Sequence, residues 1–284
     1  ITGNDDIPDY ESKAFFSSNR FMDKANGLVL SNLENNEIQW ETTTKQNLGA
    51  EINLFRNRVS LSADIFNSNT RNLIVQGILP YISGLKYYFD NSGTLNNKGY
   101  ELAINFRLLQ LKNIQWELGA SVGHYKNKIT SLPNGNFVAN VYGADILMAE
   151  GQPAVMFYLY KTKGVFATQS DAEQAGLVLV DNNHTIQNFT AGDIHFEDTD
   201  NNHIINSDDK QIIGNPNPDM YGSVYSKLSI QKFTLSAVFS YSIGNDVYNY
   251  YRSILEAGNS FNNQTKAMLN RWTADGQITT QPKA

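Results

Sequence analysis

Apolar and polar residues alternate along several segments of the chain, and this period of two constrains the fold more than any other feature of the sequence. Successive side chains of a β-strand point to opposite faces, so each segment predicts a strand with one apolar and one polar face. A tilted strand crosses a membrane with about 9–11 residues, which matches these segments. A weaker stretch, 221–230, precedes the last of them. The apolar faces comprise Leu48, Ala50, Ile52 and Leu54; Val59, Leu61, Ala63 and Ile65; Tyr100, Leu102, Ile104 and Phe106; Trp116, Leu118, Ala120 and Val122; and Phe233, Leu235, Ala237, Phe239 and Tyr241.

The connections between these segments alternate between short and long. Arg56 and Asn57 form a short one, about thirty residues follow the second segment, and residues 109–115 form the next short one. A very long connection, 126–220, precedes a short one at Gln231 and Lys232. Outer-membrane barrels have tight periplasmic turns and long outer loops. We therefore expect an all-β fold, part of a large antiparallel transmembrane β-barrel, with 126–220 as a long extracellular loop region.

A membrane crossing by this chain has to use strands, because no apolar run approaches the roughly 20 residues that a membrane-spanning helix requires. The polar faces carry isolated charges such as Glu51, Asp64 and Glu101, as a water-filled lumen permits. The long connections also favour a barrel over a compact domain. A soluble β-sandwich alternates in the same way, since one face of each sheet covers its core. Both architectures therefore stay open on the residues alone.

Composition excludes several functional classes. The chain has 28 acidic and 22 basic residues and a net charge of -6, without a basic cluster, so we expect no nucleic-acid partner. It has no Cys, which excludes disulfides and thiolate metal sites. The common motifs of hydrolases and phosphate-binding loops are missing, so we expect no enzyme. His195 lies between Asp193 and Glu197 at strand spacing, and we interpret it as a surface residue rather than an acid–base centre.

The two ends of the chain predict that residues 1–284 belong to a longer protein. The chain begins at Ile1 without a charged and apolar leader, and residues 271–276 are polar and typical of a loop rather than of a closing strand. We expect a C-terminal portion of a barrel, with further strands supplied by residues outside this sequence.

Short motifs resemble, in the same order, those of the SusC/RagA family of TonB-dependent outer-membrane receptors. The first is a Trp-Glu pair, Trp40 and Glu41, followed by three Thr that lead into a strand. Each motif alone is weak, but seven in order are specific, and residues 1–39 add none. The motifs occupy residues 40–49, 91–102, 151–166, 191–194, 214–218, 244–249 and 269–273.

The resemblance implies a plugged barrel of about 22 strands in the bacterial outer membrane. Such a barrel imports nutrient oligosaccharides or peptides, pairs with a SusD-like surface lipoprotein and is energised by TonB through its plug. Residues 1–284 would form the C-terminal barrel segment, without plug, early strands or closing strand, and would contact membrane lipid. The alternative is a secreted, calcium-stabilised carbohydrate-binding β-sandwich. A glycosidase is the third hypothesis, and it predicts that the isolated chain cleaves glycosides.

Residues 198–209 space oxygen atoms as a calcium-binding loop does. Calcium loops place oxygen side chains at positions 1, 3, 5, 9 and 12 and a carbonyl at position 7. Position 6, where Gly is usual, is His203, and position 12 is Asp instead of the longer Glu. The alternative is a solvated turn in which Asn and Asp bind their own backbone. The candidate calcium ligands are Asp198, Asp200, Asn202, the Ile204 carbonyl, Asn206 and Asp209.

Two local patterns lie inside or beside the long connections. Ser170 and Glu173 have capping-box spacing, which predicts one short helix that ends at Gly176. Aromatic clusters at 87–89 and 248–251 fit either a girdle at the membrane interface or ordinary packing.

Overall fold

The computed structural model describes residues 2–4, 12–21, 25–79, 81–85, 87–180, 185–259 and 262–283. Contacts divide the chain into two compact units. The first comprises Ile1–Phe137, Leu147–Val155 and Pro216–Asp246, and the second comprises Val138–Ile146, Met156–Asn215 and Val247–Ala284.

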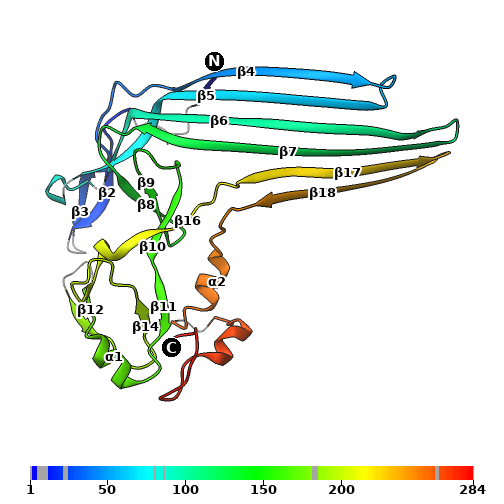
Figure 1. The fold of residues 1–284 in the computed structure, drawn as a ribbon. Coiled ribbons are helices and arrows are strands. Elements are labelled where there is room, and N and C mark those ends of the chain that lie inside the picture. Colours follow the sequence, from blue (N-terminus) through cyan, green and yellow to red (C-terminus); the bar gives the residue numbers. More distant parts are fainter. Residues whose placement is uncertain are drawn as a thin grey trace. The chain divides into compact units, whose positions relative to one another are not determined.

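The first unit is built on one antiparallel sheet in which most neighbours in the sheet are also neighbours in sequence (Figure 1). The order is β1-β4-β5-β6-β7-β17-β18, and the long insertion lies between β7 and β17. A separate hairpin pairs β2 (Phe16–Phe21) with β3 (Ala25–Leu30). The bounds are β1 Thr2–Asn4, β4 Glu41–Leu54, β5 Val59–Ile78, β6 Tyr87–Gln110, β7 Ile114–Ser131, β17 Met220–Ile230 and β18 Phe233–Ile243.

All six predicted strand segments are strands, including the weak one, which is β17 and pairs along its length with β7 and β18. The predicted connection of about thirty residues before Lys98 is wrong. β5 extends to Ile78 and β6 begins at Tyr87, and their pairing passes through irregularities on either side of Leu73. Such bulges let a ladder continue where the simple alternation stops. β7 likewise continues to Ser131, so the first residues of the predicted loop region 126–220 are strand.

The short connections are tight turns, as predicted. Phe55, Arg56 and Asn57 have φ values of 51°, 56° and 63°, which reverse the chain between β4 and β5. Gln231 has a φ of 52° and lies between β17 and β18. Left-handed backbone suits tight hairpins because its twist matches that of the flanking strands.

The register places the apolar residues of neighbouring strands beside one another, in rows that cross the sheet. None of these side chains is buried, and many are largely exposed: the exposed fraction is 70% for Leu48, 53% for Ile52 and 71% for Phe239. In a β-sandwich they would be buried against a second sheet, so the sandwich alternative is wrong for the described residues. Two successive rows are Ala50, Ala63, Leu102, Val122, Gly222 and Tyr241, and Ile52, Leu61, Ile104, Ala120, Val224 and Phe239.

The long insertion is folded rather than an open loop. Phe166, Ala172, Leu177, Phe189 and Ile205 form its buried core. Its strands make a four-stranded sheet, β16-β10-β9-β8, and two smaller sheets, β11-β14 and β13-β12-β15. Its strands are β8 Phe137–Val141, β9 Ala144–Met148, β10 Met156–Tyr160, β11 Thr162–Val165, β12 Val178–Val180, β13 Ile186–Asn188, β14 Ile194–Phe196, β15 Ile204–Ile205 and β16 Lys210–Gly214.

The predicted short helix is present as α1, Gln169–Ala175, but its cap is not the predicted one. Thr168 is the N-cap and forms the capping box with Asp171, two residues before the predicted pair of Ser170 and Glu173. The helix ends at Gly176, which is left-handed with a φ of 63°, as predicted.

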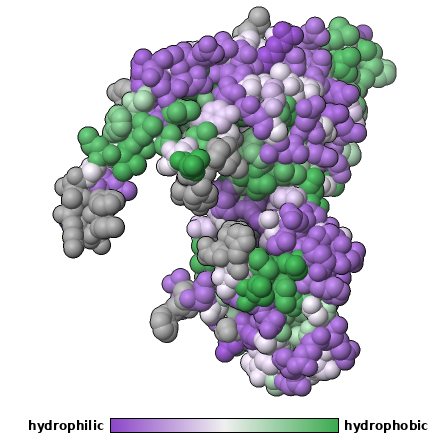
Figure 2. Space-filling model, turned by 90° about the vertical axis from the view of Figure 1, so that its left-hand side faces the viewer, coloured by the Kyte–Doolittle hydropathy of each residue, from purple (hydrophilic) through white to green (hydrophobic). Residues whose placement is uncertain are grey.

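The C-terminal part contains α2, Tyr250–Leu255, and a short 3-10 turn, Lys266–Asn270. Its aromatic cluster packs against other side chains: the ring centroids of Tyr142 and Tyr250 lie 5.3 Å apart, and those of Phe157 and Tyr248 lie 6.4 Å apart. Within the part of the chain described, no helix is long and apolar enough to span a membrane. The face at the end where β5 joins β6 is mostly hydrophilic, with separate apolar patches (Figure 2).

Candidate functional site

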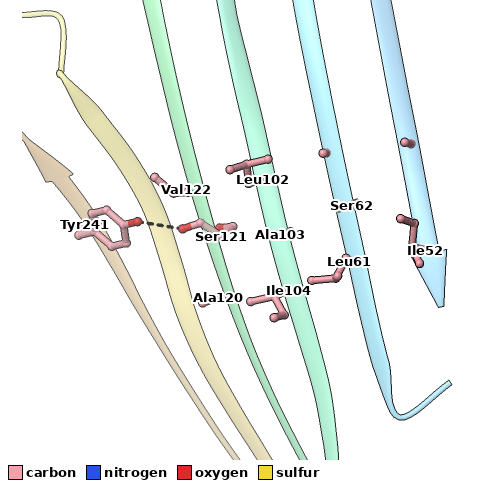
Figure 3. A pocket seen from close by; sticks show the side chains of 12 residues that line it. Ile52, Leu61, Ser62, Leu102, Ala103, Ile104, Ala120, Ser121, Val122 and Tyr241 are labelled. Carbon is pink, nitrogen blue, oxygen red and sulfur yellow. Dashed lines mark hydrogen bonds between the residues drawn. The ribbon is translucent and has the colours of Figure 1, made fainter. Parts of the chain in front are cut away.

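The apolar face of the sheet contains a shallow groove where small side chains lie between larger ones. Its lining includes Ala50, Ala63 and Ala120 of β4, β5 and β7. Tyr241 on β18 lies at one side of it (Figure 3). A second hollow, lined by Leu48, Ile65, Tyr100 and Leu102 among others, adjoins it on the side toward the long connections. This face therefore offers a continuous apolar surface with room for hydrocarbon chains.

Tyr241 shows how aromatic rings cover glycines in this wall. Gly222 lies opposite Tyr241 in the register, and a Cβ on Gly222 would meet the Ser121 carbonyl and the Tyr241 hydroxyl. The Tyr241 hydroxyl donates to the Ser121 carbonyl oxygen at 2.9 Å (Figure 3). Aromatic cover of a strand glycine restores packing that the missing side chain removes.

The polar face uses the same device twice. The ring of Tyr225 lies over Gly119 and that of Tyr221 over Gly123, where any Cβ would collide with the ring. Their hydroxyls reach β6: Tyr225 donates to Asn105 Oδ1 at 3.0 Å, and Tyr221 donates to Glu101 Oε1 at 2.8 Å. Two tyrosines of β17 therefore bridge β7 and fasten onto β6, which fixes the positions of polar groups on this face.

The charges predicted on the polar face lie there. Asp64 pairs in register with Glu101, and Asn47 Nδ2 donates to Asp64 Oδ1 at 3.2 Å. Farther along the same face, Arg107 Nε lies 3.7 Å from Glu117 Oε1. An exposed apolar face opposite a charged, hydrogen-bonded face is the arrangement of a barrel wall with lipid outside and water inside.

The acidic loop brings together three of the six predicted calcium ligands. Single carboxylate oxygens of Asp198, Asp200 and Asp209 lie within 4.8 Å of one another. Asp209 is fully buried. His203 has a φ of 65°, so it adopts the left-handed turn that Gly usually supplies at position 6. The backbone therefore curls as the spacing predicted, despite the missing glycine.

The other candidate ligands have roles within the loop. Asn202 Oδ1 accepts from the Ile204 N–H at 2.6 Å, and Asn206 Oδ1 accepts from the Asp208 N–H at 2.7 Å. Ile204 pairs with Val178 in a parallel bridge between β15 and β12. These contacts fit the solvated turn as well as a calcium loop, so the calcium site stays a prediction.

The Asp198 carboxylate is held in its charged form. Burial acts to raise the pKa of Asp198, but the backbone N–H of His203, at 2.9 Å, and further hydrogen bonds outweigh it and lower the pKa. A carboxylate that stays ionised at mildly acidic pH suits either a bound cation or a turn held by backbone donors.

Among the described residues, no carboxylate pairs with His195 as an acid–base centre would require. Its ring stacks on Phe166 at 4.4 Å between centroids, and burial, followed by the charge of Lys163, lowers its pKa. Asp193 instead pairs with Lys283 at 3.0 Å, and Glu197 pairs with Lys161 at 3.0 Å. His195 is half-buried rather than fully at the surface, and the charges on either side of it are paired with lysines, as on a strand of mixed charges.

Sequence reasoning missed the tyrosine bridges of β17. Their alternation signal was the weakest, and their partners Asn105 and Glu101 are both 120 residues away in sequence. A usable signal was present: the Tyr residues of 221–225 and the Gly residues of 119–123 share the same spacing.

Comparison with known proteins gives the same assignment. Residues 8–146 match the family model described as "TonB dependent receptor-like, beta-barrel". TonB-dependent receptor P3 of Formosa agariphila is 32% identical over 99% of this chain, which spans 28% of that protein. TonB-dependent receptor SusC of Bacteroides thetaiotaomicron is 25% identical over 75% of this chain, equal to 20% of its own length.

A solved structure has the same fold. "Structure of the RagAB peptide transporter" superposes with a TM-score of 0.72 and 24% identity, covering 99% of this chain and 30% of that one. Together with the exposed apolar rows, these similarities establish the resemblance that the seven motifs carried. The chain belongs to the TonB-dependent receptors of the SusC/RagA type and spans about three tenths of the length of such relatives.

Proposed function

We propose that the full-length protein is the barrel of a nutrient importer in the bacterial outer membrane, with this chain as part of its wall. The observation that carries the proposal is the exposed apolar face, which continues in register from β4 to β18 and lies opposite a charged face. The apolar face meets lipid, and the charged face meets water and solute in the lumen.

The proposed cargo is an oligosaccharide or a peptide. A SusD-like surface lipoprotein delivers it, and TonB energises its import. The names SusC and RagAB of the relatives support this choice, and the RagAB structure is that of a peptide transporter. The lumen face of this chain offers amide, hydroxyl and carboxylate groups, such as Asn105, Tyr225 and Glu101, that suit either cargo.

The test uses the organism that carries the full-length gene. Deletion of the gene should abolish or slow growth on particular oligosaccharides or on peptides as the limiting nutrient, and leave growth on glucose and ammonium unchanged. The protein should fractionate with outer membranes, and a plasmid copy should restore growth. A protein recovered in the soluble fraction, or a deletion without any nutrient phenotype, would contradict the proposal.

We also propose that the acidic loop binds one calcium ion that stabilises the folded insertion. Three carboxylates with oxygens within 4.8 Å of one another support it, because like charges so close repel unless a cation or donors lie between them. Calorimetry on the full-length protein should show heat when calcium is added after chelation. Asp200→Asn should remove that heat, whereas Asp208→Asn, outside the predicted ligand set, should retain it. No heat with the unmodified protein would refute the calcium site.

A further inference from the structure

The outward face of the wall changes character along the strands. On β6, Phe106, Ile104, Leu102 and Tyr100 follow one another on this face, and Lys98 comes next. Lys98 lies on the side of the long connections, away from the tight turns at 55–58 and 231–232. The first residue beyond the apolar residues on this face of β6 is therefore a cation.

Three more cations share this face and this end. Lys126 is the register partner of Lys98, Lys128 is the partner of Asn96, and Arg71 is the partner of Thr94. All four side chains are exposed. Within the described residues, none of them forms an ion pair with a carboxylate. Cations directly opposite one another in neighbouring strands destabilise the pair unless an anion lies between them.

Charges are segregated between the two faces of the sheet. The outward positions of β4, β5, β6 and β7 between 42–54, 59–71, 94–106 and 116–130 carry no Asp or Glu. The carboxylates within these ranges, Asp64 and Glu101 among them, lie on the lumen face. The cations therefore share their face with no carboxylate of these ranges, so an anion from outside the strands fits them.

Three hollows follow one another along this face, from the apolar belt toward the cations. The apolar groove over Ala50 and Ala63 adjoins the hollow at Tyr100, and beyond it lies a polar hollow that includes Arg71. Lys98 is four residues along β6 from Leu102, roughly 13 Å for an extended strand. A lipid that lays an acyl chain in the groove would place its headgroup at the cations. The polar hollow is lined by Thr44, Gln46, Asn67, Asn69, Arg71, Asn96 and Thr130.

We propose that Arg71, Lys98, Lys126 and Lys128 form a docking site for the phosphorylated headgroup of an outer-leaflet lipid, an inference that rests on the proposed function because it requires the wall to span the outer membrane. Lys and Arg near a membrane surface attract anionic headgroups, and Arg and the amides supply hydrogen-bond donors for phosphate oxygens. The aromatic Tyr100 and the ring of His124, 5.5 Å apart, mark the interface below the headgroup.

The test uses the full-length receptor in detergent, titrated with monophosphoryl lipid A and followed by native mass spectrometry. The dephosphorylated form of the same lipid is the matched ligand. We expect the receptor to prefer the phosphorylated form. The K98Q/K126Q variant should lose about 25-fold in affinity for that form, since each cation near the surface is worth about fivefold. Equal affinity of the variant and the unmodified receptor overturns the proposal.

The matched control removes two cations from the other face. Lys45 lies over the Phe66 ring, 4.9 Å from its centroid, and Lys227 pairs in register with Glu117. Lys45 and Lys227 therefore both belong to the lumen face. K45Q/K227Q changes the net charge equally and should keep the unmodified affinity. An equal loss in this control, or displacement of the lipid by millimolar inorganic phosphate, overturns the lipid site. If the lipid site is disproved but the receptor still takes up nutrient, the proposed importer function stands. If the receptor binds the lipid but takes up no nutrient, only the importer function is refuted.

Discussion

At the scale of single residues, Asp209 holds the acidic loop together whether or not calcium binds. Its Oδ1 accepts from the Thr199 N–H at 2.8 Å, and its Oδ2 accepts from the Asn206 N–H at 2.9 Å. The side chain is fully buried, so no water replaces it. The sequence predicted that Asp209 belongs to the loop but not that it links the two ends of it, because spacing along a chain does not show which group a carboxylate faces.

Asp209→Ala should loosen this loop without affecting the membrane wall. Two backbone N–H groups would lose their acceptor, at about 1–3 kcal/mol for each buried group left unpaired. Hydrogen exchange on the full-length protein should show faster exchange over residues 198–210. Asp208→Ala, at the exposed neighbouring position, should leave the exchange unchanged, and equal protection in both variants would show that Asp209 does not hold the loop.

At the scale of strands, the alternation predicted which segments pair and which face of each is apolar, because that pattern is local. It did not predict how far β5 and β6 extend. Residues 67–72 and 91–97 are mostly Asn, Ser and Thr, which interrupts the alternation, and their pairing includes side-chain contacts such as Asn96 Nδ2 to Asn67 Oδ1 at 2.8 Å. The left-handed Asn72, with a φ of 56°, sets the irregular register near the end of this pairing.

The tyrosine–glycine pairs predict a coupling between β7 and β17. Gly119→Ala should displace the Tyr225 ring and break its hydrogen bond to Asn105. The free energy of unfolding should fall by about 1–3 kcal/mol, measured as a lower unfolding midpoint of the full-length receptor in detergent. Tyr225→Ala should also destabilise, but the double variant should be less destabilised than the sum of the two, because the collision is gone. Additive effects would show that the ring does not depend on the glycine.

At the scale of the whole molecule, the decisive property is that one face of the wall meets hydrocarbon. A soluble sheet buries its apolar face within its own chain, whereas the apolar side chains of this face stay accessible, with exposed fractions of 71% for Leu235 and 82% for Phe233 on β18. The sequence alone left the sandwich open, since alternation is the same in both folds. The choice depends on what covers the face, which is a property of the environment and of the assembled fold rather than of any segment.

Leu61 and Ser62 provide a matched pair to test this property, because they are adjacent and point to opposite faces near the middle of the belt. Lys at a lipid-facing position near the bilayer midplane costs about 2–4 kcal/mol. Leu61→Lys should therefore reduce the fraction of full-length receptor that folds into outer membranes, measured as the heat-modifiable band on a gel. Ser62→Lys places the same charge in the lumen, where water solvates it, and should fold almost normally. If both variants fold equally well, the apolar rows do not face lipid, and the lipid contact on which the importer and the headgroup site both depend is wrong.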